Sequence, residues 1–212
     1  TKDLLQVSLL ADAPAVMVAR PGLPQKTLRD VMQEARKSPR KFTFGSGGQG
    51  SSAHLAMEQL LAQNTVQMTH IPFRGIAAAM VDVMADRVDV AIGSVGSTSA
   101  QLKDGRLHGL AISGDARHPL LPSVPTFAEA GFGNYKMMYW FGMMAPGGTP
   151  AAVVERLQQE VARAVTMPKV REVFAAAGVR PTANTPAAFA ALVREEVALW
   201  TELIKRSDIK PE

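Results

Sequence analysis

Residues 42–61, FTFGSGGQGSSAHLAMEQLL, join a short apolar strand to a helix through four glycines and three serines. A strand is expected at residues 42–44, and a helix is expected from about Ser52 because Ala53, Ala56, Met57, Leu60 and Leu61 share one face. At such a junction backbone N–H groups and the positive end of the helix dipole converge. Ligands of open α/β sheets bind beyond the carboxyl ends of the strands. The segment therefore predicts an α/β fold with an anion-binding loop.

Strands and helices alternate outward from this loop through the first two thirds of the chain. Thr27 is expected to cap a helix that ends at residues 38–39, with Asp30 in capping-box spacing. A break at residues 12–14 is expected to separate the first two strands. Strands are predicted at residues 7–10, 15–19, 42–44, 66–71, 88–92 and 107–112, and further helices at residues 76–84 and 98–103. This alternation favours a largely parallel sheet covered on both faces.

The chain changes character after residue 118. A proline-rich connector leads to a short helix that Thr126 and Glu129 are expected to cap. A long apolar strand follows at residues 136–145, with Phe141 expected in the core. Three helices are predicted after it, at residues 149–165, 168–177 and 185–206. The first and last of them begin with Thr-Pro-Ala-Ala, which favours threonine as the N-cap and proline as the first helical residue.

The apolar stripes of these C-terminal helices have few strands to pack against. Val153, Val154 and Leu157 mark the stripe of the first helix, and Phe189 and Trp200 lie on that of the last. We therefore expect part of their sheet to come from sequence upstream of residue 1.

Composition and spacing argue against several classes of protein. The formal charge is only +4, and the densest basic stretch, residues 36–41, has no interleaved aromatic residues, so nucleic-acid binding is not expected. The chain has no cysteine, which removes disulfides and thiolate chemistry. His70, His108 and His118 lack metal-ligand spacing, so no metal site is expected.

The glycine-rich loop leaves enzymatic alternatives open. Gly45, Gly47 and Gly50 satisfy the G-x-G-x-x-G fingerprint of dinucleotide-binding folds. The acidic residue that normally follows the next strand is missing, but Arg74 could contact a 2′-phosphate, so an NADP-dependent enzyme remains an alternative. A P-loop is excluded because Ser51 follows Gly50 where a P-loop has lysine. A serine hydrolase is not expected because G-x-S-x-G is absent around the serines.

The order and spacing of several motifs resemble the substrate-binding proteins of tripartite tricarboxylate transporters, which are periplasmic receptors of the Bug or TctC type. The resemblance extends over essentially all 212 residues. It rests on LLA at residues 9–11, PGLPQKTL at 21–28, FGSGGQGSSAHLA at 44–56, HIPFRG at 70–75, GRLHGLAIS at 105–113, LPSVPT at 121–126 and WFGMMAPGGTP at 140–150.

This resemblance implies a two-lobed periplasmic-binding-protein-like α/β fold without catalytic activity. Residues 1–12 and 138–212 would belong to the first lobe and residues 13–137 to the second, with the strands near residues 7–19 and 136–145 crossing between them. The second lobe would be complete, whereas the first would lack the N-terminal strand and loop that form the other half of the family's carboxylate site. The resemblance also implies a periplasmic location, no cofactor, no nucleic acid and a monomeric state.

The ligand implied by the resemblance is a small organic mono- or dicarboxylate, delivered to membrane transporter subunits or a sensor kinase. Backbone N–H groups from Gly47 to Ser52 are expected to hold the carboxylate. The effector-binding domain of a transcription regulator shares this architecture and remains an alternative. The candidate ligand-binding residues are Ser46, Gly47, Gly48, Gln49, Gly50, Ser51, Ser52, His54, Phe73, Arg74, Gly75, Ser94 and Trp140.

Overall fold

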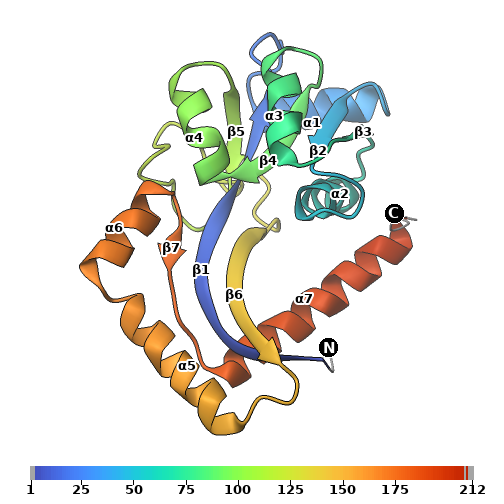
Figure 1. Cartoon of the computed structure of the whole chain (residues 1–212). Coiled ribbons are helices and arrows are strands. Elements are labelled where there is room, and N and C mark those ends of the chain that lie inside the picture. The colour runs from blue at the N-terminus through green and yellow to red at the C-terminus, as the bar shows by residue number, and fades with distance from the viewer. Residues whose placement is uncertain (1–2, 208, 210–212) are drawn as a thin grey trace. The chain divides into compact units, whose positions relative to one another are not determined.

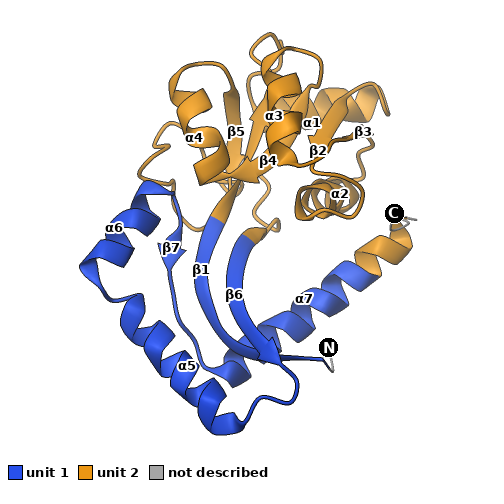
Figure 2. Ribbon diagram, viewed as in Figure 1, with its two compact units in different colours: residues 1–13, 139–201 blue, residues 14–138, 202–212 orange. Residues whose placement is uncertain are grey.

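A computed structural model of the chain describes residues 3–207 and residue 209. The chain forms two compact units (Figure 2): unit 1 comprises residues 1–13 and 139–201, and unit 2 comprises residues 14–138 and 202–212. The chain passes from one unit to the other within or at the end of three elements, which are labelled in Figure 1: β1 (Leu4–Ala19), β6 (Met138–Pro146) and α7 (Pro186–Arg206).

A mixed sheet forms the centre of unit 2, in the strand order β3-β2-β4-β1-β5. The strands are β2 (Thr43–Ser46), β3 (Thr69–Pro72), β4 (Val90–Ser94) and β5 (His108–Ile112), together with the second half of β1. β2 pairs in parallel with both β3 and β4. β1 runs antiparallel to β4 and β5, so the prediction of a largely parallel sheet is wrong for β1.

The predicted break in the first strand does not occur, since β1 is continuous from Leu4 to Ala19. Its ladder to β7 (Arg180–Pro181) involves Ala11 and Asp12, and its ladder to β4 begins at Ala15. Pro14 falls between the two ladders. Its missing N–H therefore removes no bond from either one.

Four helices connect the strands of unit 2: α1 (Leu28–Lys37), α2 (Ser52–Asn64), α3 (Ile76–Met84) and α4 (Val95–Lys103). The predicted cap of α1 is confirmed, since the Thr27 side chain accepts a hydrogen bond from the N–H of Asp30. α4 begins three residues earlier than expected because Ser94 and Ser97 form a capping box. The predicted helix at Thr126 is a turn, although the Thr126–Glu129 capping bonds themselves form.

One apolar cluster ties α3 and α4 to the sheet. Its fully buried members include Val16 and Val18 of β1, Val83 of α3 and Val95 of α4. The connection from β2 to β3 runs along the sheet in the opposite direction from the connections β3 to β4 and β4 to β5. Since β-α-β crossovers are right-handed, α2 lies on the opposite face from α3 and α4.

Unit 1 contains the first half of β1, flanked by β6 and β7, and the helices α5 (Ala151–Ala164), α6 (Pro168–Ala176) and α7. Its apolar core is small: Val7, Ala145 and Val154 form one buried cluster. Phe189 is fully buried and packs edge-on against Trp140, with ring centroids 5.4 Å apart.

Of the two helices predicted to begin with a threonine N-cap, one does so. Thr185 accepts a hydrogen bond from the N–H of Ala188 in α7, as expected of an N-cap. In α5 the N-cap is Pro150 and no side-chain capping bond forms among the described residues, so the cap predicted at Thr149 is wrong.

Unit 1 exposes most of the large apolar side chains that lie on the surface of the described residues. Phe141 is 53% exposed, so its predicted core position is wrong. In α5, Val153 and Leu157 are exposed while Val154 and Val161 are buried. Eight of the nine exposed large hydrophobic residues are in this unit: Leu4, Phe141, Val153, Leu157, Met167, Val173, Val197 and Leu199.

Within the described residues, no helix combines the length and apolarity required to cross a membrane.

Candidate functional site

Three helices of unit 2 begin at one edge of its sheet. Because β2 pairs in parallel with β3 and β4, the carboxyl ends of these three strands lie together. α2, α3 and α4 start directly after them, through residues 47–51, residues 73–75 and Ser94 respectively. The partial positive charges of three helix N-termini therefore converge on this edge.

The glycine-rich loop after β2 lies directly against the start of α3. The N–H of Phe73 donates to the carbonyl oxygen of Ser46 at 3.1 Å. A Cβ atom added to Gly47 would lie 3.1 Å from the backbone nitrogen of Ile76 and 3.4 Å from backbone atoms of Gly75. Only a residue without a side chain fits here without displacing one backbone or the other.

The N-terminus of α3 carries no side-chain cap. Its N-cap residue is Gly75, with φ of 99°, and no side-chain capping bond forms there among the described residues. By contrast, Ser51 caps α2 by accepting from the N–H of His54, and Ser94 caps α4. The uncapped start of α3 beside the loop is thus a place where an anion could accept hydrogen bonds.

Hydrogen bonds inside the loop occupy some of the N–H groups that were expected to hold a ligand. The N–H of Gly48 donates to Ser46 Oγ at 3.2 Å, that of Gly50 to His54 Nδ1 at 3.0 Å, and that of Ser51 to the Gly48 carbonyl at 3.2 Å. The loop thus uses the N–H groups of these three residues to hold its own shape.

Three other N–H groups remain as candidate donors to a ligand. No hydrogen bond described for residues 3–207 and 209 uses the N–H of Gly47, Gln49 or Ser52. The N–H of Ser52 belongs to the first turn of α2 and so has no acceptor within the helix.

Two histidines lie stacked under the loop. His54 is 3% exposed, so it does not present its ring to solvent. Its ring lies 3.8 Å from that of His70, nearly parallel, and the His70 ring stacks in turn on Phe44 at 4.8 Å. Burial lowers the pKa of His54, and burial together with the charge of His54 lowers the pKa of His70 to about 4. Both rings are therefore neutral at pH 7.

Sequence reasoning missed the contribution of His70, which was considered only as a metal ligand. The signal was present in the strand pairing: β2 and β3 pair so that Phe44 lies opposite His70, two residues before the end of each strand. No group of three or more His, Cys, Asp or Glu side chains suited to a metal ion occurs in the described part of the chain.

The remaining predicted residues fall into two groups. Phe73, Arg74 and Gly75 lie beside the loop, with Phe73 partly buried against the core and Arg74 exposed. Ser94 lies at the same sheet edge, but its side chain is engaged in the capping box of α4. Trp140 is in unit 1, where it is partly buried against Phe189.

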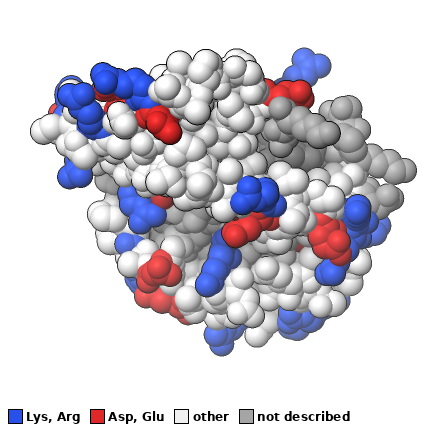
Figure 3. Space-filling model, turned by 90° about the horizontal axis from the view of Figure 1, so that it is seen from below, with Lys and Arg blue, Asp and Glu red and all other residues white. Residues whose placement is uncertain are grey.

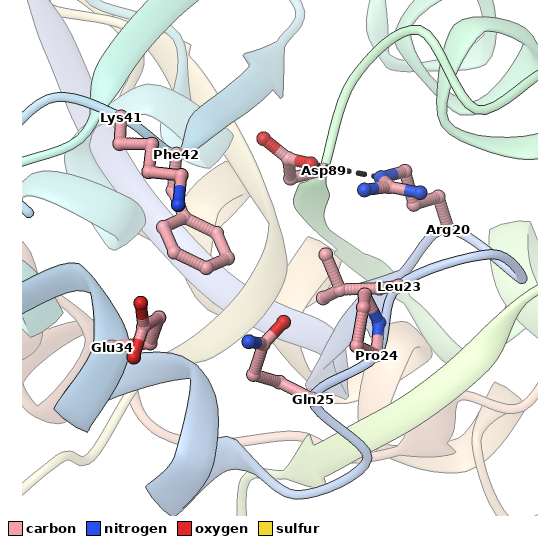
Figure 4. A pocket seen from close by; sticks show the side chains of 8 residues that line it. All are labelled: Arg20, Leu23, Pro24, Gln25, Glu34, Lys41, Phe42 and Asp89. Carbon is pink, nitrogen blue, oxygen red and sulfur yellow. Dashed lines mark hydrogen bonds and ion pairs between the residues drawn. The ribbon is translucent and has the colours of Figure 1, made fainter.

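A cavity of about 210 Å³ lies at the opposite edge of the sheet (Figure 4). Its lining includes Phe42 and Asp89, which come just before β2 and β4, and Arg20, which follows β1. Arg20 Nε donates to Asp89 Oδ1 at 2.8 Å, while the Asp89 Oδ2 atom accepts from the N–H and hydroxyl of Thr43. Arg20, Asp89 and Thr43 therefore satisfy one another, and the other polar side chains that line the cavity are Gln25, Glu34 and Lys41.

A second cavity, of about 350 Å³, lies at this same edge beside Lys26 and His108. The His108 Nε2 atom is 2.7 Å from the Lys26 carbonyl oxygen and is thus engaged. Neither cavity adjoins the glycine-rich loop.

Charged side chains of one sign do not form a large cluster on the face shown in Figure 3. Basic and acidic side chains there form small separate groups on a mostly uncharged surface. This distribution differs from the continuous basic patch of nucleic-acid-binding proteins.

Comparison with known proteins identifies the family. A family model described as "Tripartite tricarboxylate transporter family receptor" matches residues 1–209. A protein of Pseudomonas sp., described by its position in the tcbD-tcbE intergenic region, is 37% identical over 204 residues, covering 96% of this chain and 61% of the relative. The chain spans between 60% and 64% of the length of three such curated relatives.

Solved structures agree with this match. An R. palustris protein determined with adipate has a TM-score of 0.87 and 29% identity, covering 99% of this chain and 70% of that one. The periplasmic binding protein BugD has a TM-score of 0.84 and 28% identity, covering 99% and 71%. MatC from Rhodopseudomonas palustris, with bound malate, has a TM-score of 0.82 and 27% identity, covering 95% and 69%.

These matches bear on the alternatives that the sequence left open. The family model describes a transport receptor rather than an enzyme, so the NADP-dependent alternative is not supported. The two-lobed α/β fold class is confirmed by the solved relatives. The chain belongs to the tripartite tricarboxylate transporter receptor family of periplasmic solute-binding proteins.

Proposed function

We propose that this chain binds a small organic carboxylate at the glycine-rich loop of unit 2 and serves as a receptor for a tripartite tricarboxylate-type transporter. The observation that carries the proposal is the close approach of Gly47 to the uncapped N-terminus of α3: a Cβ atom added to Gly47 would lie 3.1 Å from the Ile76 nitrogen. Two relatives were determined with adipate and with malate, which are both dicarboxylates.

The loop offers hydrogen-bond donors that suit one carboxylate group. The N–H groups of Gly47, Gln49 and Ser52 are the candidate donors, and the hydroxyl of Ser52 is exposed at the start of α2. The dipoles of α2 and α3 add positive potential at the same place. Charge-assisted bonds of this type are about twice as strong as neutral ones, which favours a carboxylate over a neutral amide or alcohol.

The second carboxylate of a dicarboxylate needs a separate partner. Arg74 is exposed and follows β3 at the same sheet edge, and its guanidinium can bind a carboxylate through two parallel hydrogen bonds. We assign Phe73 and Ser94, which lie at the same sheet edge of unit 2, to shaping the remainder of the site.

Unit 2 corresponds in this proposal to a complete second lobe and unit 1 to part of the first. The exposed apolar face of unit 1 supports this division, because it leaves side chains of α5, α6 and α7 uncovered. The chain spans 61% of the length of one curated relative and 70% of that of one solved relative. The partner of the loaded receptor would be a membrane transporter subunit or a sensor kinase, and the receptor itself would be a monomer.

An NMR titration tests the proposal on the chain as it stands. Adipate and malate are added to uniformly ¹⁵N-labelled protein up to about 10 mM, which detects affinities in the millimolar range. We expect saturable shifts of the Gly47, Gln49 and Ser52 amides. Adipamide, the uncharged diamide of adipic acid, serves as the matched control and should leave these amides unshifted. Shifts confined to residues around the cavity of Figure 4, or no saturable shift with either acid, would refute the assignment of the site.

A further inference from the structure

Two histidine ring nitrogens, Nδ1 of His54 and Nε2 of His70, anchor the glycine-rich loop. Four of the six residues from Gly45 to Gly50 are glycines, and glycine loses more backbone freedom on ordering than any other residue. A free loop of this composition would have to be ordered each time it bound an anion, which would weaken binding. Specific anchors are therefore needed if its N–H groups are to be held ready.

His54 provides the first anchor. Its Nδ1 atom accepts the N–H of Gly50 at 3.0 Å, and a backbone N–H can only donate. The Nδ1 atom must therefore be unprotonated, which puts the proton of the neutral ring on Nε2. The Nε2 atom faces Oε1 of Glu58 at 3.8 Å, one turn further along α2. The ring itself is fixed by burial and by stacking on His70.

His70 provides the second anchor, through a serine. Its Nε2 atom lies 2.6 Å from Oγ of Ser46, which is fully buried. The same Oγ accepts the N–H of Gly48 at 3.2 Å and lies 3.0 Å from the Gly48 carbonyl oxygen. His70 thus orients the hydroxyl that holds Gly48, just as His54 holds Gly50.

The two anchors fix alternate residues of the loop. With the N–H groups of Gly48 and Gly50 turned inward to Ser46 and His54, the intervening Gln49 and the preceding Gly47 keep N–H groups that bond to no other described residue.

We propose that His54 and His70 are positioning residues: their ring nitrogens hold the loop in the conformation in which the N–H groups of Gly47, Gln49 and Ser52 are free for a carboxylate. Neither ring touches the ligand in this scheme. The consequence for ligand binding rests on the proposed function, whereas the anchoring of the loop does not.

Matched substitutions separate the hydrogen bonds from the packing of the rings. His54→Phe keeps an aromatic ring in the stack but removes the acceptor, while His54→Asn replaces Nδ1 by a side-chain oxygen at a similar position. For His70, Phe and Gln make the corresponding pair, since the amide of Gln reaches the position of Nε2. Ser46→Ala removes the link to Gly48 and leaves both rings in place.

The first measurement needs no ligand. In wild-type protein labelled with ¹⁵N, we expect a scalar coupling across the hydrogen bond between the Gly50 nitrogen and His54 Nδ1. Amide exchange at Gly50 should rise by about tenfold or more in His54→Phe, as expected for the loss of one hydrogen bond, and return toward the wild-type rate in His54→Asn. Exchange at Val90 in the central strand β4 reports whether the variants remain folded.

The second measurement is adipate affinity in the same variants. We expect about a tenfold loss in His54→Phe and in His70→Phe, with recovery in His54→Asn and His70→Gln. Absence of the coupling, or unchanged Gly50 exchange in a folded His54→Phe, would overturn the anchoring. Equal adipate affinity in wild type and both Phe variants would overturn the positioning role. If wild type binds neither adipate nor malate, the proposed function fails, and the exchange and coupling data alone decide whether the histidines anchor the loop.

Discussion

Replacing Gly47 by alanine should push the glycine-rich loop away from α3. The added methyl carbon would lie 3.1 Å from the Ile76 nitrogen and 3.4 Å from two backbone atoms of Gly75, so neither neighbour can yield by a side-chain rotation. Overpacking of this kind costs about 1–3 kcal/mol. The unfolded chain loses entropy on the same substitution, which offsets about 0.4–1 kcal/mol of that cost. We therefore expect a net loss of between about 0 and 2.6 kcal/mol in the free energy of unfolding, with a midpoint of about 1.3 kcal/mol.

Gly148→Ala is the matched control for this prediction. A Cβ atom at Gly148 would meet nothing within 4 Å, so the entropy gain should stand alone and stability should stay level or rise by about 0.4–1 kcal/mol. Urea unfolding of both variants, followed by circular dichroism, measures the difference. If Gly47→Ala proves as stable as Gly148→Ala and leaves the amide spectrum of residues 47–52 unchanged, the close contact between loop and α3 is not real.

Three further predictions concern other contacts. Gly142→Ala should destabilise the chain by about 1–3 kcal/mol in urea, because its Cβ would overlap the buried ring of Phe189; wild-type stability would contradict the packing of unit 1. Ser51→Ala should lower the free energy of unfolding by about 1 kcal/mol, because the Ser51 side chain caps α2 by accepting a hydrogen bond from the backbone N–H of His54. Ser52 is exposed, so Ser52→Ala should change this free energy by no more than about 0.5 kcal/mol, and equal effects of the two substitutions would count against the cap. The pKa of His70 is lowered from an ordinary 6.5 to about 4, so the unfolded state binds a proton more readily than the folded state does. The free energy of unfolding should therefore be full above pH 6.5 and fall as the pH drops toward 4. We expect a fall of about 1–2 kcal/mol, which allows for the partial exposure of the ring. His70→Phe should flatten that slope in urea titrations run at several pH values, and an unchanged slope would assign it to another group, such as His54, whose pKa burial also lowers.

Local signals predicted local structure well. Thr27 with Asp30 marked the start of α1, and the run from Phe44 to Ser52 marked a strand, loop and helix, because these features depend on residues within one turn of each other. The same reasoning placed Phe73 to Gly75 beside the loop, since parallel neighbours end at one sheet edge.

Features that depend on distant partners were missed. The antiparallel direction of β1 depends on its pairing with β4 and β5, which lie more than seventy residues further along the chain and leave no mark in the pattern of β1 itself. Phe141 has the apolar character of a core residue, yet nothing in the described chain covers it. The direction of each loop N–H could not be predicted either, because it is decided by the ring of His54 and by the hydroxyl of Ser46 under His70.

The most direct test of carboxylate binding is a crystal structure of the protein grown with adipate. We predict that one carboxylate group lies within hydrogen-bonding distance, about 2.7–3.2 Å, of at least two of the N–H groups of Gly47, Gln49 and Ser52. Adipate bound elsewhere, with this loop unchanged and its three N–H groups facing only solvent, would contradict the account.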